Sequence, residues 1–506
     1  MNLALIARLL GGFTLFLSAA QIAPLLLAFS EEQAFSGTAL DPVAGFSASI
    51  GTGLLVALLL RLLGRSKDRS FFRREALAVV GLSWILAGAL GAVPYVWSGT
   101  IPDAPSAVFE TISGLTTTGA TVLGSADYPQ IEGLPHSILL WRSMTQWLGG
   151  LGIILVFVTL LPSMGVTGKS LLQSEQIGIS NDDYRPRMLD QARTLLLVYV
   201  VLTASCMLLL ALAGIPWFDA LCHAFTALAT GGFSTRNASI AGFASPLVDV
   251  ILTFFMFLAG CNFLVLASTA IRGPRAPGSM LKDPEFRLYG AITICLVAVI
   301  SVSLMVSGRG FWESLRYGSF NAISVFTSTG YATDDYQRWP LLPILLLFTS
   351  MIVGASSGST AGGLKTVRFL VACKLMAYTV RHYVRPKSVE RIKVGGIPLP
   401  AEVISSALAL VALWFVGIFA GTLVLSLDGR IPFLSALATS TSLLGCCGPS
   451  ICQVVDGRVV GPDMGPMGAY GVLGGGTKLF LSWLMLLGRL EFLAPLALFV
   501  PSFWRR

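Results

Sequence analysis

The chain has 506 residues, of which 54% are hydrophobic and only 12% are charged, and its formal net charge is +8. The mean hydropathy of +0.77 excludes a soluble globular protein of this length and indicates a polytopic membrane protein. Because the basic residues are dispersed, the positive charge forms no stripe of the kind that binds nucleic acid. We therefore compare its distribution with the membrane spans.

Ten charge-poor runs are each long enough for a membrane-spanning helix, which needs roughly 20 apolar residues. The first run is too long for a signal-peptide core and lacks a small-residue cleavage site, so we expect it to be retained as a helix. The ten runs are residues 4–29, 43–63, 76–98, 138–162, 194–215, 246–271, 288–307, 341–380, 401–427 and 479–500.

Basic residues collect in alternate connections, at residues 61–74, 169–193, 272–287, 365–393 and 505–506. The positive-inside rule predicts that these segments are cytoplasmic. Residues 98–139 contain no Lys or Arg, as expected of an outer loop. Both termini are then cytoplasmic.

Four outer segments are too short or too polar to span: residues 104–118, 217–230, 312–329 and 432–447. We interpret each as a re-entrant half-helix, because irregular backbone at membrane depth must be buried by protein or line a water-filled pore. The alternative is ordinary outer loops with helical turns.

Each short segment ends in small residues and a glycine. Gly119, Gly231, Gly330 and Gly448 are spaced by 112, 99 and 118 residues, which indicates a fourfold internal repeat. Glycine allows a backbone turn that aims carbonyl oxygens at an ion. The pattern predicts a cation pore.

Six motifs together carry a resemblance to a known family. They are residues 117–121, 141–152, 230–235, 328–333, 357–365 and 485–491. On these motifs the sequence resembles the Trk/Ktr/HKT family of potassium and sodium transporters, in its bacterial Trk branch, over nearly the whole chain.

The resemblance implies an all-α integral membrane protein with ten transmembrane helices. Four pseudo-symmetric repeats, each a helix, a pore half-helix and a helix, would surround a central pore. The expected units are a two-helix N-terminal extension (1–70) and repeats at 71–163, 190–271, 286–380 and 400–506. The expected location is the bacterial inner membrane.

The resemblance also implies that potassium, as the transported ion, is coordinated by backbone oxygens of a four-part filter, with no organic cofactor. Glycine at Gly119 favours potassium, whereas serine there goes with sodium in the family. The fourth segment departs from the family pattern, because two cysteines precede Gly448 where asparagines are common. The expected filter residues are Thr117, Thr118, Gly119, Ala229, Thr230, Gly231, Ser328, Thr329, Gly330, Cys446, Cys447 and Gly448.

A run of small residues from Gly354 to Gly363 interrupts an apolar stretch and matches the family's intramembrane gating loop. A helix-packing face is the alternative. We expect the gate to include Gly354, Ser357, Gly358, Gly362, Gly363 and Arg489.

Three charged positions lie in or near apolar runs. A charge such as Arg489 costs about 2.5–3.5 kcal/mol at a bilayer centre, which suggests a role. The resemblance implies that it faces the pore below the filter; the alternative is an interfacial arginine that snorkels or pairs with Glu491. For Arg142 we favour structural pairing, with Glu110 or Asp127 as the partner.

Lys365, Arg368 and Lys374 lie on the helix before the inner loop, and positive-inside topology explains most of this basic face. The resemblance implies a homodimer, contact with membrane lipid, and docking on a cytoplasmic ring of nucleotide-binding regulatory subunits. The chain itself contains no Walker or Rossmann motif.

Two other functions remain as alternatives. A symporter could couple potassium or sodium to protons or another ion, with Glu491 and Asp249 as the main acidic candidates. A hydrolase using Ser356 is disfavoured because no strand precedes its G-x-S-x-G pattern. We expect a transporter and not an enzyme.

Overall fold

In the computed structural model, residues 1–35, 39–65, 73–159, 184–272, 280–386, 392–394 and 397–504 are described. The chain is almost entirely helical. The N-terminal part comprises α1 (Leu3–Ala20), α2 (Ile22–Phe35) and α3 (Pro42–Leu63).

The rest of the chain forms four successive units, each a long helix, a short helix and a third helix or broken helix. The first two are α4 (Arg73–Trp97), α5 (Ala104–Leu115) and α6 (His136–Thr159), then α9 (Tyr184–Leu212), α10 (Trp217–Leu228), α11 (Pro246–Ala259) and α12 (Phe263–Arg272). The last two are α14 (Pro284–Val306), α15 (Phe311–Phe326), α16 (Leu341–Val353) and α17 (Thr366–Val384), then α18 (Ala401–Ser426), α19 (Phe433–Leu444), α20 (Gly475–Arg489), α21 (Leu493–Ala497) and α22 (Pro501–Trp504).

The remaining elements are small. Short 3-10 turns are η1 (Ile131–Gly133), η4 (Ser239–Phe243) and η5 (Tyr336–Arg338). Two antiparallel hairpins pair β1 (Lys393–Val394) with β2 (Ile397–Pro398) and β3 (Val454–Val455) with β4 (Arg458–Val459).

Six helical stretches of the described chain are long and apolar enough to cross a membrane, or seven if α11 and α12, bent by 101°, form one span. Many of their large apolar side chains are exposed, including Leu54, Leu58, Leu197 and Phe419. Such a surface is typical of helices that face lipid. The protein is a multi-pass, all-helical membrane protein.

Three of the ten apolar runs are broken by three or more non-helical residues, and run 4–29 is interrupted at Gln21 alone. Helices stop at Ala259, Val353 and Arg489 and resume at Phe263, Thr366 and Leu493. The break before Thr366 was expected from its small residues, whereas the breaks within runs 246–271 and 479–500 were not. At the last break Glu491 and Phe492 have φ of 56° and 63°, which ends the helix.

The four short helices α5, α10, α15 and α19 lie at the four segments predicted as half-helices, although each ends a few residues earlier than expected. Only α5 begins with a side-chain cap, whereas α10, α15 and α19 begin after Pro216, Gly310 and Pro432 without one. Before α5, the Asp103 carboxylate accepts a hydrogen bond from the Ser106 N–H at 3.1 Å, and Pro105 lies in the first turn. Each helix ends where the next backbone turn becomes left-handed.

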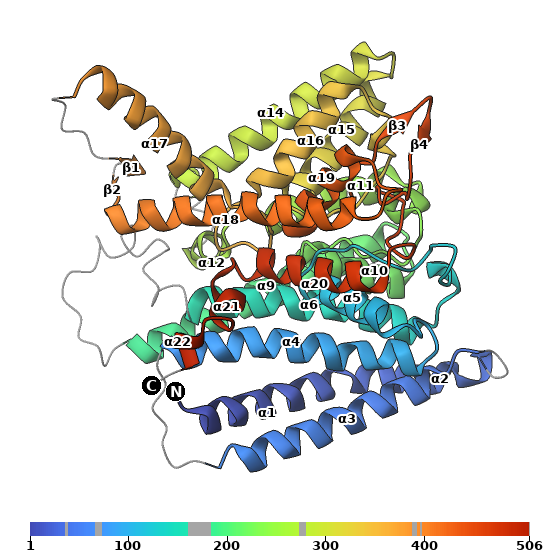
Figure 1. The fold of residues 1–506 in the computed structure, drawn as a ribbon. Coiled ribbons are helices and arrows are strands. Elements are labelled where there is room, and N and C mark those ends of the chain that lie inside the picture. The colour runs from blue at the N-terminus through green and yellow to red at the C-terminus, as the bar shows by residue number, and fades with distance from the viewer. Residues whose placement is uncertain are drawn as a thin grey trace.

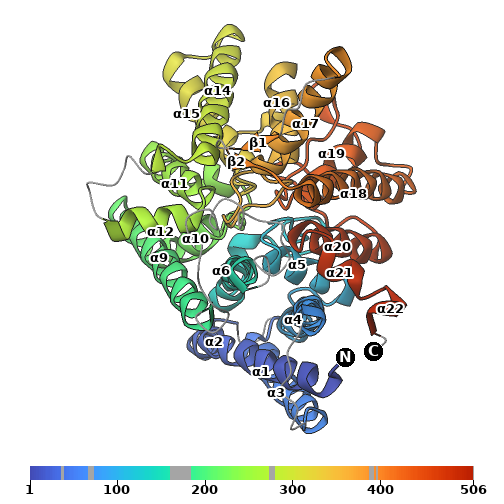
Figure 2. The same ribbon diagram turned by 90° about the vertical axis from the view of Figure 1, so that its left-hand side faces the viewer.

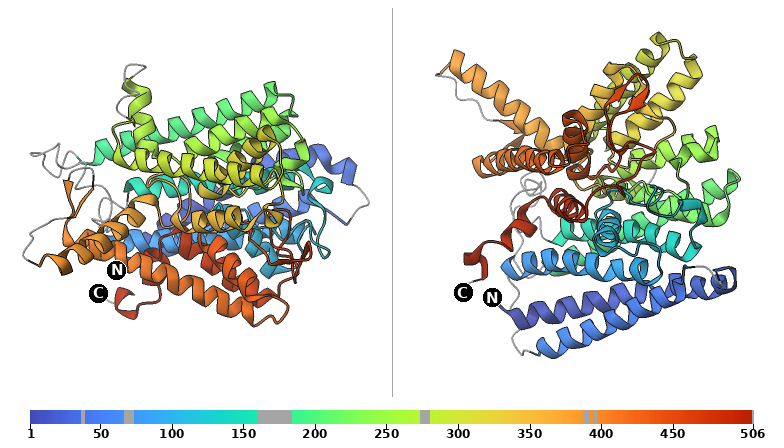
Figure 3. Two further views of the ribbon diagram at one scale, coloured as in Figure 1. Left: turned by 90° about the horizontal axis from the view of Figure 1, so that it is seen from above. Right: turned by 45° about the vertical axis from the view of Figure 1, so that its right-hand side comes forward.

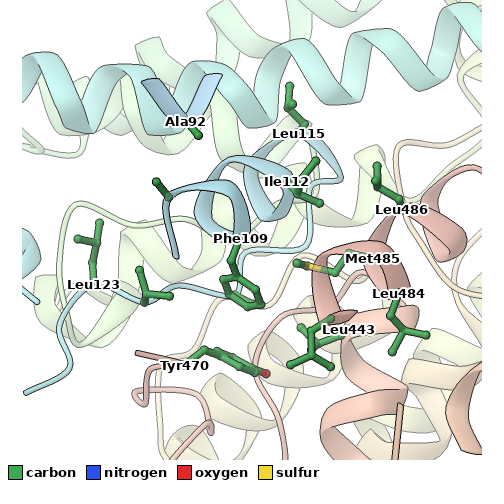
Figure 4. Packing of buried hydrophobic residues seen from close by; sticks show 14 of the residues in the cluster. Ala92, Phe109, Ile112, Leu115, Leu123, Leu443, Tyr470, Leu484, Met485 and Leu486 are labelled. Atoms are coloured by element: carbon green, nitrogen blue, oxygen red, sulfur yellow. The ribbon is translucent and has the colours of Figure 1, made fainter. Parts of the chain in front are cut away.

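The first unit packs against the last and so closes the set of four (Figure 2). Phe109 and Ile112 of α5 lie against Met485 of α20 and Leu443 of α19 (Figure 4). The ring of Phe109 is 5.5 Å from that of Tyr470, centroid to centroid. This apolar contact joins residues more than 300 positions apart.

The N-terminal helices lie outside the four units, alongside α4 (Figures 1 and 3). The Ser49 hydroxyl of α3 donates to the Leu90 carbonyl at 3.2 Å, and Phe46 meets Trp141 edge-to-face. The ends of the described chain lie at one end of the bundle with α17, and the β3–β4 hairpin lies at the other (Figure 1).

Candidate functional site

The same backbone turn follows each of the four short helices. One residue after the helix cap the backbone is left-handed, with φ of 53° to 55°, and two residues later a glycine has φ of 76° to 93°. The left-handed residues are Thr117, Thr230, Ser328 and Cys446, and the glycines are Gly119, Gly232, Gly330 and Gly448.

This geometry corrects the sequence alignment in the second segment. Gly232 is equivalent to Gly119, so the residues that match Thr117, Thr118 and Gly119 are Thr230, Gly231 and Gly232 rather than residues 229–231. With two adjacent glycines, the sequence does not reveal which one takes the positive φ. The true spacing of the ring glycines is 113, 98 and 118 residues.

The four glycines and the four residues before them form a closed ring. A Cβ placed on Gly119 would collide with the carbonyl oxygen of Gly231, and one on Gly232 with that of Thr329. In the same way Gly330 abuts the carbonyl of Cys447, and Gly448 abuts that of Thr118. Each glycine is required both by its φ and by the next segment's backbone. We call these eight residues the filter ring.

A cavity of about 50 Å³ lies directly against the filter ring. All four ring glycines line it, together with Arg142, Ser234 and Tyr470 among others. A water molecule needs roughly 10–15 Å³ of such space, so the cavity has room for a few waters or a partly hydrated ion.

Each of the four short helices supports its own turn through one polar side chain at an equivalent position. Glu110, His223, Asn321 and Thr439 repeat at the same spacing as the ring glycines and reach the segment that follows the ring. The partners are the Val122 N–H at 2.9 Å, Ser234 Oγ at 3.0 Å, Thr333 Oγ1 at 3.0 Å and Ser450 Oγ at 2.8 Å, respectively. We call these four residues the struts.

Arg142 neutralises the one carboxylate among the struts. Its Nε donates to Glu110 Oε1 at 2.8 Å, which identifies Glu110 rather than Asp127 as the ion-pair partner. Its Nη1 donates to the Ser234 carbonyl at 2.7 Å, and the guanidinium lies 3.8 Å from the Phe233 ring centroid. Arg142 therefore joins the first and second segments.

The Gln146 side chain holds the second segment from behind. Its Nε2 donates to the Gly231 carbonyl at 2.6 Å, and its Oε1 accepts from the Phe233 N–H at 3.1 Å. Gln146 is fully buried. The sequence offered it only as part of a motif, without a role.

The fourth segment keeps the backbone of the other three with different side chains. In the first and third segments two threonine hydroxyls pair, Thr116 with Thr118 at 2.7 Å and Thr327 with Thr329 at 2.8 Å. In the fourth, the Cys447 thiol instead faces the Val325 carbonyl at 3.9 Å. The cysteines therefore change the side-chain contacts that support the ring, but they do not change the course of its backbone.

On the inner side of the ring lies the loop of residues 354–365, which we call the inner loop. Gly354, Gly358 and Gly363 have positive φ of 67°, 71° and 79°, so the small residues predicted for the gate let the chain turn back on itself. The helix-packing alternative is wrong, because these residues are not helical.

The inner loop touches three of the four segments. The Gly362 N–H donates to Ser328 Oγ at 2.6 Å, and the Thr360 hydroxyl donates to the Leu228 carbonyl at 3.0 Å. A Cβ on Gly362 would collide with the Gly445 carbonyl. The loop therefore lies directly beneath the ring.

Carboxylate and guanidinium groups hold the loop from opposite directions. The Ser357 N–H donates to Glu285 of α14 at 2.5 Å. Arg489, at the end of α20, donates from Nη1 to the Thr360 carbonyl at 2.5 Å. In the sequence, Glu285 is marked only as an acidic residue beside the Asp283-Pro284 helix start, which did not predict its contact with the loop.

Arg489 is only 3% exposed, and within the described part of the chain its Nε and Nη2 have no hydrogen-bond partner. The alternative that it pairs with Glu491 is wrong, because Glu491 pairs with Arg368 at 2.6 Å. Buried against the inner loop, the guanidinium places a positive charge under the ring.

The basic inner face inferred from Lys365, Arg368 and Lys374 is largely absent as a surface. Lys365 and Arg368 are buried, and Lys365 donates to the Ala361 carbonyl. Lys374 donates to the Lys393 carbonyl at 2.6 Å. The basic cluster predicted at 169–193 lies mostly outside the described residues.

Comparison with known proteins agrees with this geometry. Residues 54–506 match the family model TrkH, described as a cation transport protein. The chain is 34% identical to the Trk system potassium uptake protein TrkH of Salmonella typhimurium, over 100% of both chains. It is 32% identical to the TrkG protein of Escherichia coli K12, over 85% of this chain and 86% of that one.

A solved structure matches the whole fold. The crystal structure of the potassium transporter TrkH from Vibrio parahaemolyticus superimposes with a TM-score of 0.86 at 29% identity, covering 100% of both chains. The chain belongs to the TrkH family of cation transport proteins.

Proposed function

We propose that this member of a transport family, which is not an enzyme, is the potassium-selective, channel-like membrane subunit of a potassium uptake system. The single observation that carries the proposal is the filter ring, in which backbone carbonyls of four segments abut four glycines of the neighbouring segments in a closed circle. Carbonyl oxygens arranged in this way replace the hydration shell of a cation. The names of the relatives support potassium as the transported ion.

The proposed ion ligands are backbone oxygens of the residues around the ring. They belong to Thr117, Thr118 and Gly119, to Thr230, Gly231 and Gly232, to Ser328, Thr329 and Gly330, and to Cys446, Cys447 and Gly448. The close approach of neighbouring segments supports this set, because a side chain on a ring glycine would break the contact.

We propose that the inner loop and Arg489 form the gate. The loop is held against three filter segments by hydrogen bonds, and a buried positive charge touches it from below. A cation leaving the ring would meet both. Opening would require the contacts of Gly362 and Thr360 to break.

For the architecture we propose ten spans, counting each broken third helix as one. The repeats are 71–163, 190–271, 286–380 and 400–506, preceded by the extension at 1–70. With the basic segments inside, both termini are cytoplasmic in a bacterial inner membrane. Docking on a cytoplasmic nucleotide-binding ring and homodimerisation remain proposals from the family resemblance.

Coupled symport is the rival mechanism, and the two acidic residues that would serve it are both engaged. Asp249 pairs with Arg316 at 2.6 Å, and Glu491 pairs with Arg368. A carboxylate held by a guanidinium is poorly suited to bind and release a proton or sodium ion during each cycle. This observation favours the channel-like mechanism.

The test is tracer uptake into proteoliposomes that contain the purified full-length protein. Potassium uptake should persist without a proton or sodium gradient and should exceed sodium uptake under matched gradients. The Arg489→Gln variant is measured in parallel, because a closed gate in the wild-type protein would hide the uptake of either ion. Uptake that requires a proton gradient, or equal uptake of both ions, would overturn the proposal.

A further inference from the structure

An open cavity of about 500 Å³ lies between α1 and α3, far from the filter ring. It is at the end of the bundle where the described chain begins (Figure 1). Ligand pockets in proteins commonly have volumes of roughly 300–1,000 Å³. Its lining residues are Arg8, Leu9, Gly12, Arg61, Gly64 and Arg65.

Glycines let the two helices approach closely at this end. A Cβ on Gly64 would lie 2.7 Å from the Arg8 backbone nitrogen, and one on Gly11 would lie 3.1 Å from Arg61 Cγ. Gly12, in contrast, has no neighbour within 4 Å of its Cβ position. Arginine side chains therefore line the cavity, and the space next to Gly12 is open.

The lining carries three positive charges. In the part of the chain that the structure describes, Arg8, Arg61 and Arg65 have no hydrogen-bond or ion-pair partner. Glu75, at the start of α4, is buried, and its carboxylate accepts a hydrogen bond from the Asn2 N–H at 3.1 Å. A ligand that complements the charge of this cavity would therefore be an anion.

The surroundings are apolar and face outward. Leu9, Leu58, Leu62 and Leu63 are all exposed on α1 and α3. Arg8 lies in the first turns of α1 and Arg61 in the last turn of α3, which is the depth of lipid headgroups. An anion that enters this cavity can keep a hydrocarbon chain against the leucines.

We propose that this cavity binds the phosphate headgroup of an anionic phospholipid. Guanidinium groups bind phosphate oxygens in pairs, and basic pockets between transmembrane helices hold anionic headgroups. On the proposed orientation the site lies in the cytoplasmic leaflet. The extension at 1–70 thereby gains a lipid-binding role that does not depend on ion selectivity or gating.

The test is native mass spectrometry of the full-length protein in detergent, titrated with phosphatidylglycerol or with phosphatidylcholine of the same acyl chains. Wild type should retain phosphatidylglycerol in preference. The Arg8→Gln, Arg61→Gln, Arg65→Gln triple variant should lose roughly fivefold in affinity per arginine, or on the order of 100-fold in total.

A second variant fills the cavity without changing its charge. Gly12→Leu on α1 should also lower phosphatidylglycerol affinity. Gly51→Leu, at an open glycine on α3 that does not line the cavity, should not. The charge-matched control is the triple variant of Arg287, Arg385 and Arg458 to Gln, all exposed and outside the cavity. It should bind as wild type does.

Competition with inorganic phosphate distinguishes a lipid headgroup from a free anion as the ligand. It should compete with phosphatidylglycerol only weakly, because it lacks the chains that rest on the leucines. Full competition by phosphate at equal concentration would assign the site to a free anion and overturn the lipid proposal. Unchanged lipid affinity in both the arginine triple variant and Gly12→Leu would overturn it as well.

Discussion

The two halves of the proposed pore, the filter ring on the outer side and the inner loop with Arg489 on the other, are built in opposite ways. In the outer half, four segments repeat one backbone turn, with φ values that agree within a few degrees at each left-handed residue. In the inner half, one unit supplies the whole loop at residues 354–365, and a different unit supplies Arg489. The same four-unit chain thus keeps its symmetry on one side of the ring and abandons it on the other.

The difference follows from what each half must do. In the proposed filter, replacing the hydration shell requires ligands on all sides of the ion, so every segment must supply carbonyl groups at one level. Obstructing a pore requires one object on the axis, so one loop is enough. Even in the outer half only the backbone is symmetric. The side chains of the four struts differ, because they are a carboxylate, an imidazole, an amide and a hydroxyl.

The largest effect should come from breaking the symmetric ring itself with Gly119→Ser. A non-glycine residue at this φ of 82° costs on the order of 1–3 kcal/mol, and its Cβ would collide with the Gly231 carbonyl. We expect the potassium-to-sodium permeability ratio to fall roughly tenfold or more. Gly133→Ser, at an open glycine, is the control, and an unchanged ratio in Gly119→Ser would contradict the filter assignment.

Gln146→Leu should disturb the ring from behind. It leaves the Phe233 N–H buried without a partner, at about 1–3 kcal/mol, and it removes the amide that holds the Gly231 carbonyl in place. Selectivity should fall in Gln146→Leu and fall less in Gln146→Glu, which keeps the acceptor for Phe233. Equal selectivity in all three proteins would show that the second segment needs no such support.

Arg489→Gln tests the asymmetric half. Removing the buried charge lowers the barrier to cations beneath the ring, and a reduction of about 1.4 kcal/mol corresponds to roughly tenfold faster flux. Potassium flux should rise while the permeability ratio stays constant. Arg489→Lys keeps the charge and should behave like wild type; a rise in both variants would point to lost packing instead.

Ser328→Ala cuts one hydrogen bond between the two halves. A hydrogen bond contributes about 1 kcal/mol, so the loop should open more often and flux should rise roughly fivefold. The matched control is Thr117→Ala, because Thr117 is the equivalent residue and its hydroxyl has no partner among the described residues. If Thr117→Ala raised flux equally, the bond to Gly362 would not be what holds the loop.

Cys447→Ser should have the smallest effect. The proposed ligand is the backbone carbonyl, and the thiol makes a long contact of 3.9 Å with the Val325 carbonyl. We expect the permeability ratio, measured from bi-ionic conditions, to change by no more than about twofold. A larger change would mean that the side chain at this position contributes to selectivity directly.

Much of this protein could be read from its residues. Hydropathy identified the membrane class, and polar segments that are too short to span marked α5, α10, α15 and α19. The small residues between Gly354 and Gly363 marked the loop, and the cost of burying Arg489 marked the charge beneath the ring. These signals are local, since each depends on the conformational preference or transfer cost of neighbouring residues.

Tertiary structure alone decided which residues meet. It chose Gly232 over Gly231, matched Glu110 with Arg142, and gave Glu491 to Arg368 rather than to Arg489. It also brought Gln146 to a carbonyl 85 positions away. The physical reason is that a buried polar group must find a partner within about 3 Å, and which partner lies there depends on the packing of distant helices, not on the neighbouring sequence.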